Sequence, residues 1–278
     1  MMNLFARLFA WLPRRWALAI GAGFGSLVYT LGIRRSVSLS NLRRVFPERT
    51  EEERRQIARA SYRLHGRNAA EFFSSAARGN VDLAGRVTFD RARVVEAARG
   101  HGAIIAMAHF GSWEVMGEAA AQTGLPITVL TRRLSGAANA GWRKARAAGG
   151  LSWAHQGELG LMVAALRRGE LVAISYDQNM PRSRGIFVDF FGEPACTTPA
   201  PSVLALRTGA PIFAAFPLLR EDGTHDVQLE GPLPIDPTLP AREAVQKQTQ
   251  ALAKVLEHYI RDRSDHWYWL HRRWKTRP

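Results

Sequence analysis

The sequence predicts an α/β fold: a mixed, partly parallel central sheet flanked by helices, with a hydrophobic membrane-anchoring helix at the N-terminus. Two patterns predict it. From about residue 81, short apolar segments alternate with helical segments, which is typical of a sheet that is at least partly parallel. Residues 16–33 contain no charged side chain, and this length is about the minimum for a membrane span. With 278 residues, 46% of them hydrophobic, the chain can bury a sizeable core.

The N-terminal apolar run is expected to be an uncleaved membrane anchor, residues 1–35, ahead of a catalytic domain, residues 36–278. A cleaved signal peptide has a shorter apolar core, and small residues follow it rather than an arginine pair. Arginines stand on both sides of the run: Arg7, Arg14, Arg15, Arg34, Arg35, Arg43 and Arg44. They leave the orientation undecided, and they suit a helix that spans the bilayer as well as one that lies in a single leaflet.

Two more helices are expected after the anchor, with Pro47 between them. Thr50 and Glu53 have the spacing of a capping box, which would open the second helix. Within the anchor, small residues recur four apart at Gly21 and Gly25. This spacing is more typical of closely packed helices than of a dinucleotide-binding loop, which would need an acidic residue further along the chain.

The strands of the sheet are expected at 87–89, 102–109, 127–130, 171–175 and 211–219. Helices are expected at 91–100, 114–124, 155–170, 202–210 and 241–263. An Asp-Gly pair in residues 220–231 predicts a hairpin turn. A last apolar strand is expected at 267–271, although its mixture of aromatic and basic residues also suits a membrane-interface belt.

The stretch "AHFGSWEVMG" places His109 directly after a buried strand and Glu114 in the first turn of the next helix. Ligands of open α/β sheets bind where strands end. A turn through Gly111 would let the Glu114 carboxylate fix the tautomer of His109, whose free ring nitrogen could then take a proton from a hydroxyl. The same residues could also be structural. Ser112 is expected to start the helix, because no nucleophile elbow surrounds it.

Composition limits the partners. Lys and Arg number 38 against 24 Asp and Glu, a formal charge of +14, which favours an anionic partner. No nucleic-acid-binding motif is present, so an acidic protein or an anionic membrane is expected. The single cysteine, Cys196, excludes an internal disulfide and is expected to be a packing residue. The histidines lack metal-ligand spacing, so no metal is expected.

Five segments carry a resemblance to a known family. They are "HFGSWE" (109–114), "NLRRVFPE" (41–48), "DQNMPRSRGIFVDFFGEPACTT" (177–198), "LALRTGAPI" (204–212) and "YWLHRRWKTRP" (268–278). Together with the apolar N-terminus, they resemble the lipid A biosynthesis (late) acyltransferases of lauroyl and myristoyl transferase type, within the lysophospholipid acyltransferase superfamily. The chain departs from that family's pattern at Asp189 and in "NMPRS" (179–183), which puts the acceptor and the acyl chain in question.

The resemblance implies a glycerol-phosphate-acyltransferase-like fold and transfer of an acyl group from acyl-carrier protein to a hydroxyl of a lipid A precursor, without cofactor. It implies an enzyme of the inner membrane that works on the cytoplasmic side. His109 would be the general base and Glu114 would orient it. Arg146 and Asp177 would support positioning or substrate binding, although Arg146 could also be a surface arginine. Arg182 and Arg184 are candidates for docking the carrier protein, or for holding acceptor phosphates.

Three other functions fit the residues. The acceptor could be another membrane lipid, such as a phospholipid, ornithine lipid or mannoside, or the donor could be acyl-CoA. A hydrolase could use His109 and Glu114 to activate water. A basic, membrane-associated binding protein would need no chemistry from the pair.

Overall fold

A seven-stranded sheet runs through the computed structural model, which describes residues 12–78, 85–122, 125–131, 151–155 and 157–278. The strand order is β1-β9-β8-β2-β5-β3-β4. The strands are β1 (Val87–Phe89), β2 (Ala103–Met107), β3 (Ile127–Thr131), β4 (Ser152–His155), β5 (Leu171–Ser175), β8 (Ile212–Leu219) and β9 (His225–Leu233). A separate antiparallel pair is formed by β6 (Ile186–Phe190) and β7 (Glu193–Thr197).

The central sheet is mixed, as the sequence predicts. Strands β8, β2, β5, β3 and β4 pair in parallel, whereas β9 returns antiparallel to β8, and β1 runs parallel to β9. The predicted β8–β9 hairpin is present. Its turn uses Gly223 at a φ of 83°, and Arg220 N–H donates to the Thr224 carbonyl at 2.9 Å. A glycine tolerates this left-handed conformation without steric cost.

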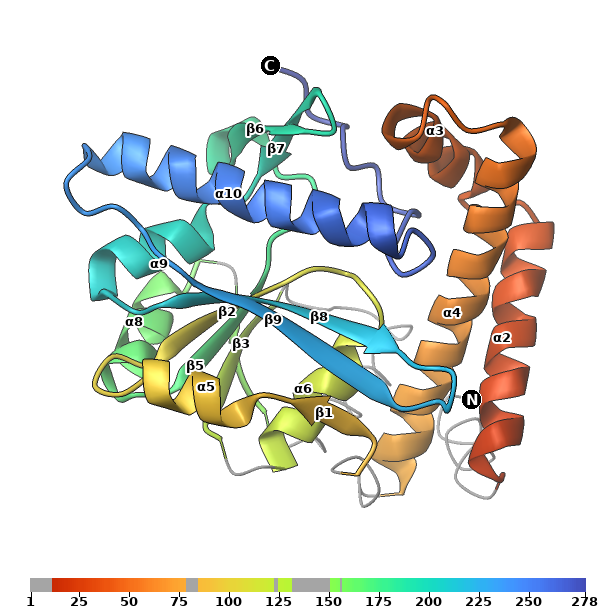
Figure 1. Ribbon diagram of the computed structural model, residues 1–278, viewed down its shortest axis with the longest axis horizontal. Helices are drawn as coiled ribbons and strands as arrows, with labels where there is room; N and C mark the ends of the chain where they lie inside the picture. The colour runs from red at the N-terminus through yellow and green to blue at the C-terminus, as the bar shows by residue number, and fades with distance from the viewer. Residues whose placement is uncertain (1–11, 79–84, 123–124, 132–150, 156) are drawn as a thin grey trace.

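Helices cover both faces of the sheet (Figure 1). One face packs against α8 (Leu159–Arg167), α9 (Ala200–Thr208) and α10 (Ala241–Asp262). The other packs against α5 (Arg91–Ala97), α6 (Trp113–Gln122) and the end of α4 (Glu51–Ala77). The sheet can be buried on both sides because its central strands are nearly continuous runs of apolar residues.

The N-terminal helices α2 (Arg14–Thr30) and α4 lie side by side (Figure 1). Their backbones approach so closely that a Cβ atom on Gly25 would lie 2.0 Å from the Tyr62 carbonyl oxygen, and one on Gly66 would lie 2.2 Å from the Gly21 carbonyl oxygen. The glycines therefore serve close helix packing, as their spacing predicts. The predicted capping box of Thr50 and Glu53 also opens α4.

We expect Gly25→Ala to destabilise the protein by about 1–3 kcal/mol, because the added methyl group must separate two packed backbones. Gly23 is the matched control. It lies on the same helix, and nothing would lie within 4 Å of its added Cβ, so Gly23→Ala should be neutral or stabilising because alanine favours helix. Chemical denaturation of both variants measures the difference. Equal effects would show that the α2–α4 crossing tolerates the methyl group.

Most of the N-terminal apolar run lies in α2, which ends at Thr30. After α2 the chain turns through Gly32 and Arg34, both at positive φ, and continues as α3 (Arg35–Val45) at 88° to α2. Within the described residues no single helix is long and apolar enough to cross a membrane, although α2 and α3 together have the necessary length and composition. The membrane anchor expected from the sequence is therefore not confirmed as one helix.

The predicted strand at 267–271 is wrong. The segment makes only an isolated bridge between Trp267 and Phe110, and Trp267 and Trp269 are buried. Buried residues at alternate positions, Trp267 and Trp269, are also typical of a strand. Here they pack in the region beyond the strand ends, where Trp267 donates to Asp177. Their burial also excludes these two residues from a membrane-interface belt. The β6–β7 pair and β4 were not predicted.

Candidate active site

Two strand ends bring His109 and Asp177 together across 68 positions of sequence. Strands β2 and β5 are parallel neighbours in which Met107 pairs with Ser175, so the residues two positions further on leave the sheet side by side. His109 Nδ1 lies 2.8 Å from Asp177 Oδ1. The His109 backbone N–H donates to Asp177 Oδ2 at 2.9 Å, and so does Trp267 Nε1, also at 2.9 Å.

The Asp177 carboxylate is ionised although it is buried. Burial alone would raise its pKa, but the His109 charge and the hydrogen bonds from His109 and Trp267 outweigh burial and lower the pKa to about 2. An ionised acceptor at Nδ1 keeps the proton of a neutral imidazole on Nδ1. His109 Nε2 is then the acceptor, and the Gln178 amide Nε2 lies 3.1 Å from it.

The turn after His109 is fixed from three directions. Gly111 N–H donates to the His266 carbonyl at 2.9 Å, Asn68 Nδ2 donates to the Gly111 carbonyl at 2.8 Å, and Tyr268 N–H donates to the His109 carbonyl at 2.9 Å. Gly111 adopts a φ of 55°, and a Cβ there would lie 1.8 Å from the Pro217 carbonyl oxygen. Only glycine fits this position, which explains the glycine in "HFGSWE".

Glu114 lies in the first turn of α6, and its side chain lines the same cavity as His109. The sequence suggested that Glu114 fixes the His109 tautomer and that Asp177 helps to bind substrate. In the structure the carboxylate at His109 Nδ1 is that of Asp177, so the tautomer-fixing contact belongs to Asp177. Glu114 stays a candidate catalytic residue through its place in the cavity wall.

The cavity at His109 has a volume of about 510 Å³, within the range of small-ligand sites. Most of its wall is apolar and comes from one face of the sheet and from α5 and α6. Wall residues of this kind include Val94, Ile105, Met107, Met116, Ile127 and Val129. Polar groups gather near the strand ends, where His109, Glu114, Gln178, Asn179 and Arg184 also line it. The site thus places a proton acceptor at the polar end of a mostly apolar cavity.

The two arginines predicted beside the site differ in position. Arg184 lines the cavity, whereas Arg182 is exposed on the short 3₁₀ helix η2 (Arg182–Arg184), where it donates to the Arg277 carbonyl at 3.2 Å. Arg146 lies outside the described residues.

The sequence analysis did not identify the residues that hold the segment after β5, which carries Asp177 and Gln178. Arg273 is buried, and its Nη1 donates to the Cys196 carbonyl at 2.9 Å and to the Gln178 carbonyl at 3.4 Å. Burial lowers its pKa to about 10, although the Asp177 charge opposes this. His271 Nε2 accepts the Asn179 N–H at 2.8 Å. The basic and aromatic C-terminus was visible in the sequence, but nothing local indicated that it would cross the active site.

An aromatic cluster surrounds the His109 ring. Trp113 lies 5.1 Å from it and Tyr268 6.3 Å, measured between ring centroids, and His65 contacts both of these rings at 5.6 and 5.2 Å. Burial, aided by the charges of His266 and His109 and opposed by the Trp267 backbone, lowers the pKa of His65 from 6.5 to about 4. His65 is therefore neutral at neutral pH.

This depressed pKa predicts a loss of stability in mild acid. The unfolded chain binds a proton at His65 near pH 6.5 and the folded chain only near pH 4, so the stability it contributes is complete above pH 6.5 and falls as the pH drops toward 4. Between pH 6.5 and 5 we expect a loss of about 1.5 kcal/mol from this group. The free energy of unfolding of His65→Phe should fall by about 1.5 kcal/mol less than that of the unsubstituted protein over the same pH range. Urea denaturation of both proteins at the two pH values measures it, and equal losses would contradict the assignment to His65.

A family model described as "Bacterial lipid A biosynthesis acyltransferase" matches residues 1–276. The chain is 32% identical over 118 residues to "Lipid A biosynthesis lauroyltransferase" of Escherichia coli K12, covering 42% of this chain and 38% of that protein. It is 27% identical over 256 residues to "Lipid A biosynthesis palmitoleoyltransferase" of the same organism, covering 88% and 80%. A "Lipid A biosynthesis acyltransferase" of Haemophilus influenzae is 22% identical over 248 residues, covering 87% and 76%.

Proposed function

The chain belongs to the bacterial lipid A biosynthesis acyltransferase family, and from this premise we propose that it transfers a fatty acyl group from an acyl-carrier-protein thioester to a hydroxyl of a lipid A precursor. The observation that carries the proposal is the His109–Asp177 pair at the polar end of an apolar cavity. A proton acceptor beside an apolar chamber suits a hydroxyl nucleophile and a fatty acyl chain.

His109 acts as the general base in this proposal. Nε2 takes the proton of the acceptor hydroxyl while the hydroxyl oxygen attacks the thioester carbonyl carbon. The tetrahedral intermediate collapses as the C–S bond breaks, and the thiolate takes the proton back from Nε2. The products are an ester and the free carrier thiol. The ionised Asp177 stabilises the imidazolium that exists between the two proton transfers.

Gln178 and Glu114 have supporting parts. The Gln178 amide lies 3.1 Å from Nε2, so the acceptor hydroxyl must share or displace this contact before it can donate its proton. Glu114 lines the cavity, and its negative charge would favour the imidazolium form of His109. The apolar wall would hold the acyl chain away from water. Arg184 and the exposed Arg182 would receive the acidic carrier protein at the cavity mouth.

Reconstitution with purified components tests the function. The protein is incubated with acyl-carrier-protein thioesters, or with the matching acyl-CoA, and a lipid A precursor, and the glycolipid is analysed by mass spectrometry. We expect the mass of one acyl group to be added from the carrier-protein donor. Transfer only to another membrane lipid, or only from acyl-CoA, would overturn the proposed acceptor or donor. Release of free fatty acid alone would indicate a hydrolase.

Membrane attachment is proposed through residues 1–35, with 36–278 as the catalytic domain. The face of α2 that points away from α4 carries large apolar side chains that are half exposed or more: Trp16 (54%), Phe24 (62%), Leu27 (50%) and Leu31 (66%). A continuous apolar surface of this kind marks an interaction site, and flanking arginines suit anionic lipid phosphates at the cytoplasmic side of the inner membrane.

Phe24→Asp should release much of the protein from the membrane, because it places a charge at the centre of the exposed apolar face of α2. Gly23→Ala, on the same helix, should leave the membrane fraction unchanged. Fractionation of cells that express each variant measures the distribution. Full retention of Phe24→Asp would assign the attachment to another surface.

A further inference from the structure

A second cavity lies outside the catalytic site, at the corner between α3 and α4. It has a volume of about 440 Å³ and is lined by Arg44, Val45, Phe46, Pro47, Glu48, Arg49, Phe191 and Arg261. Three arginines and one glutamate thus line it, and two of the arginines, Arg44 and Arg261, are ion-paired with Glu193 and Glu257. Its floor and one wall come from "NLRRVFPE", a segment to which the catalytic mechanism gives no role.

All three arginines lie over aromatic rings. Arg44 lies 5.8 Å from the centroid of the Trp274 ring and is ion-paired with Glu193. The guanidinium of Arg49 lies 4.3 Å from the centroid of the Phe46 ring, and that of Arg261 lies 4.6 Å from the Phe191 ring. Arg261 also contacts Glu257 at 3.3 Å, whereas Arg49 makes no side-chain ion pair within the described part of the chain. Rings behind the guanidinium groups hold their planes while leaving hydrogen-bond donors available.

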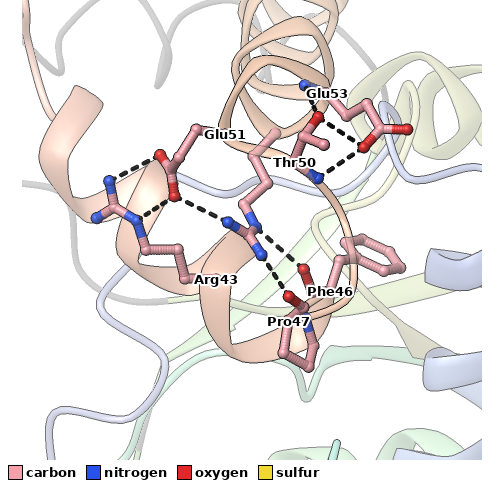
Figure 2. Close-up of polar contacts among 7 residues, drawn as sticks. Arg43, Phe46, Pro47, Thr50, Glu51 and Glu53 are labelled. Atoms are coloured by element: carbon pink, nitrogen blue, oxygen red, sulfur yellow. Dashed lines mark hydrogen bonds and ion pairs between the residues drawn. The ribbon is translucent and has the colours of Figure 1, made fainter.

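The corner is held rigid by contacts that do not use these arginines. The buried Arg54 donates from Nε to the Phe46 carbonyl at 3.0 Å and from Nη2 to the Pro47 carbonyl at 2.6 Å. Figure 2 shows Glu51 bridging this group to Arg43, with contacts of 2.8 and 2.9 Å to Arg43, and the Thr50–Glu53 box beside it. The wall that carries Phe46 and Arg49 is therefore preorganised.

The opposite wall contains an unusual backbone. Phe191 opens the β6–β7 turn at a φ of 56°, a left-handed conformation that a bulky residue adopts only at a cost. Its N–H donates to Glu257 at 2.8 Å, and its ring lies 6.4 Å from that of Phe46. A glycine or asparagine would suit this turn better, but the Phe191 ring packs against the core and lies under Arg261.

We propose that this cavity binds the phosphate headgroup of a membrane lipid. Guanidinium forks match phosphate oxygens, and a concave site of this volume suits a headgroup rather than the broad surface of a protein partner. The cavity stands at the end of α3, and the exposed apolar Leu31 and Ile33 stand at its start. The eleven residues of α3 span about 16 Å, so the cavity and these apolar side chains lie at opposite ends of one short helix. The proposal does not depend on the catalytic assignment.

Binding of a short-chain phosphatidic acid to the purified full-length protein, used below its micelle concentration and followed by calorimetry, tests this. The joint substitution Arg49→Gln and Arg261→Gln should weaken binding by about tenfold or more, because each removes a charge-assisted donor. Arg99→Gln is the control for Arg49→Gln, since Arg99 is an exposed arginine (74%) that does not line the cavity, and it should change binding by less than about twofold. If the double variant loses its fold, Arg49→Gln alone makes the same test.

Three results would overturn the proposal. Equal weakening by Arg99→Gln would indicate a general charge effect. Loss through Arg184→Gln instead would place the lipid at the catalytic cavity. Equal affinity for inorganic phosphate, or for the matching phosphatidylcholine, would exclude recognition of a lipid phosphate headgroup.

Discussion

Replacing His109 by alanine is expected to lower kcat for acyl transfer by about 10²–10⁴, the usual cost of losing a general base. His109 Nε2 is the ring nitrogen left as an acceptor once Asp177 holds Nδ1, and no other group is proposed to take the proton of the acceptor hydroxyl. The rate is measured with a carrier-protein thioester under single-turnover conditions, so that product release does not hide the chemical step.

The fold should survive this substitution. The backbone contacts of residue 109, its N–H to Asp177 and its carbonyl to Tyr268, do not need the imidazole. Circular dichroism and thermal unfolding therefore serve as controls. Normal transfer by a folded His109→Ala protein would rule out the mechanism.

Asp177→Asn is expected to lower kcat by a similar factor, about 10²–10⁴, through the tautomer of His109. Asp177 Oδ2 accepts two N–H groups, from the His109 backbone and from Trp267. An asparagine must therefore keep its oxygen there and turn its NH₂ toward His109 Nδ1. Nδ1 then becomes an acceptor, and the ring proton moves to Nε2, where the base is needed.

Glu114→Gln distinguishes the proposed role of Glu114 from that of Asp177. We expect it to lower kcat less than Asp177→Asn does, because Glu114 is proposed to act on the charge of the imidazolium and not on its tautomer. KM and kcat are compared for both variants with the same donor and acceptor. A full loss in Glu114→Gln combined with near-normal turnover in Asp177→Asn would return the orienting role to Glu114.

The sequence by itself determined the features that depend on nearby residues. Apolar runs predicted β2, β5 and β8, the Asp222-Gly223 pair predicted the β8–β9 turn, and Thr50 with Glu53 predicted the start of α4. These hold because hydrophobic periodicity, capping and turn chemistry act within a few residues. The same local logic placed His109 at a strand end.

Only the tertiary structure showed that Asp177 contacts His109 Nδ1. The two residues are 68 positions apart in the sequence, and the pairing of β2 with β5 brings them together. From the sequence alone, Glu114 was the acid expected to orient His109, because it lies only five residues further along the chain. The segment after α10 shows the same limit: Trp267 and Trp269 alternate as in a strand, yet they lie over the strand ends and hold Asp177 and Ser264 through their indole N–H groups. Such contacts are fixed by the global packing of distant elements, which no local propensity encodes.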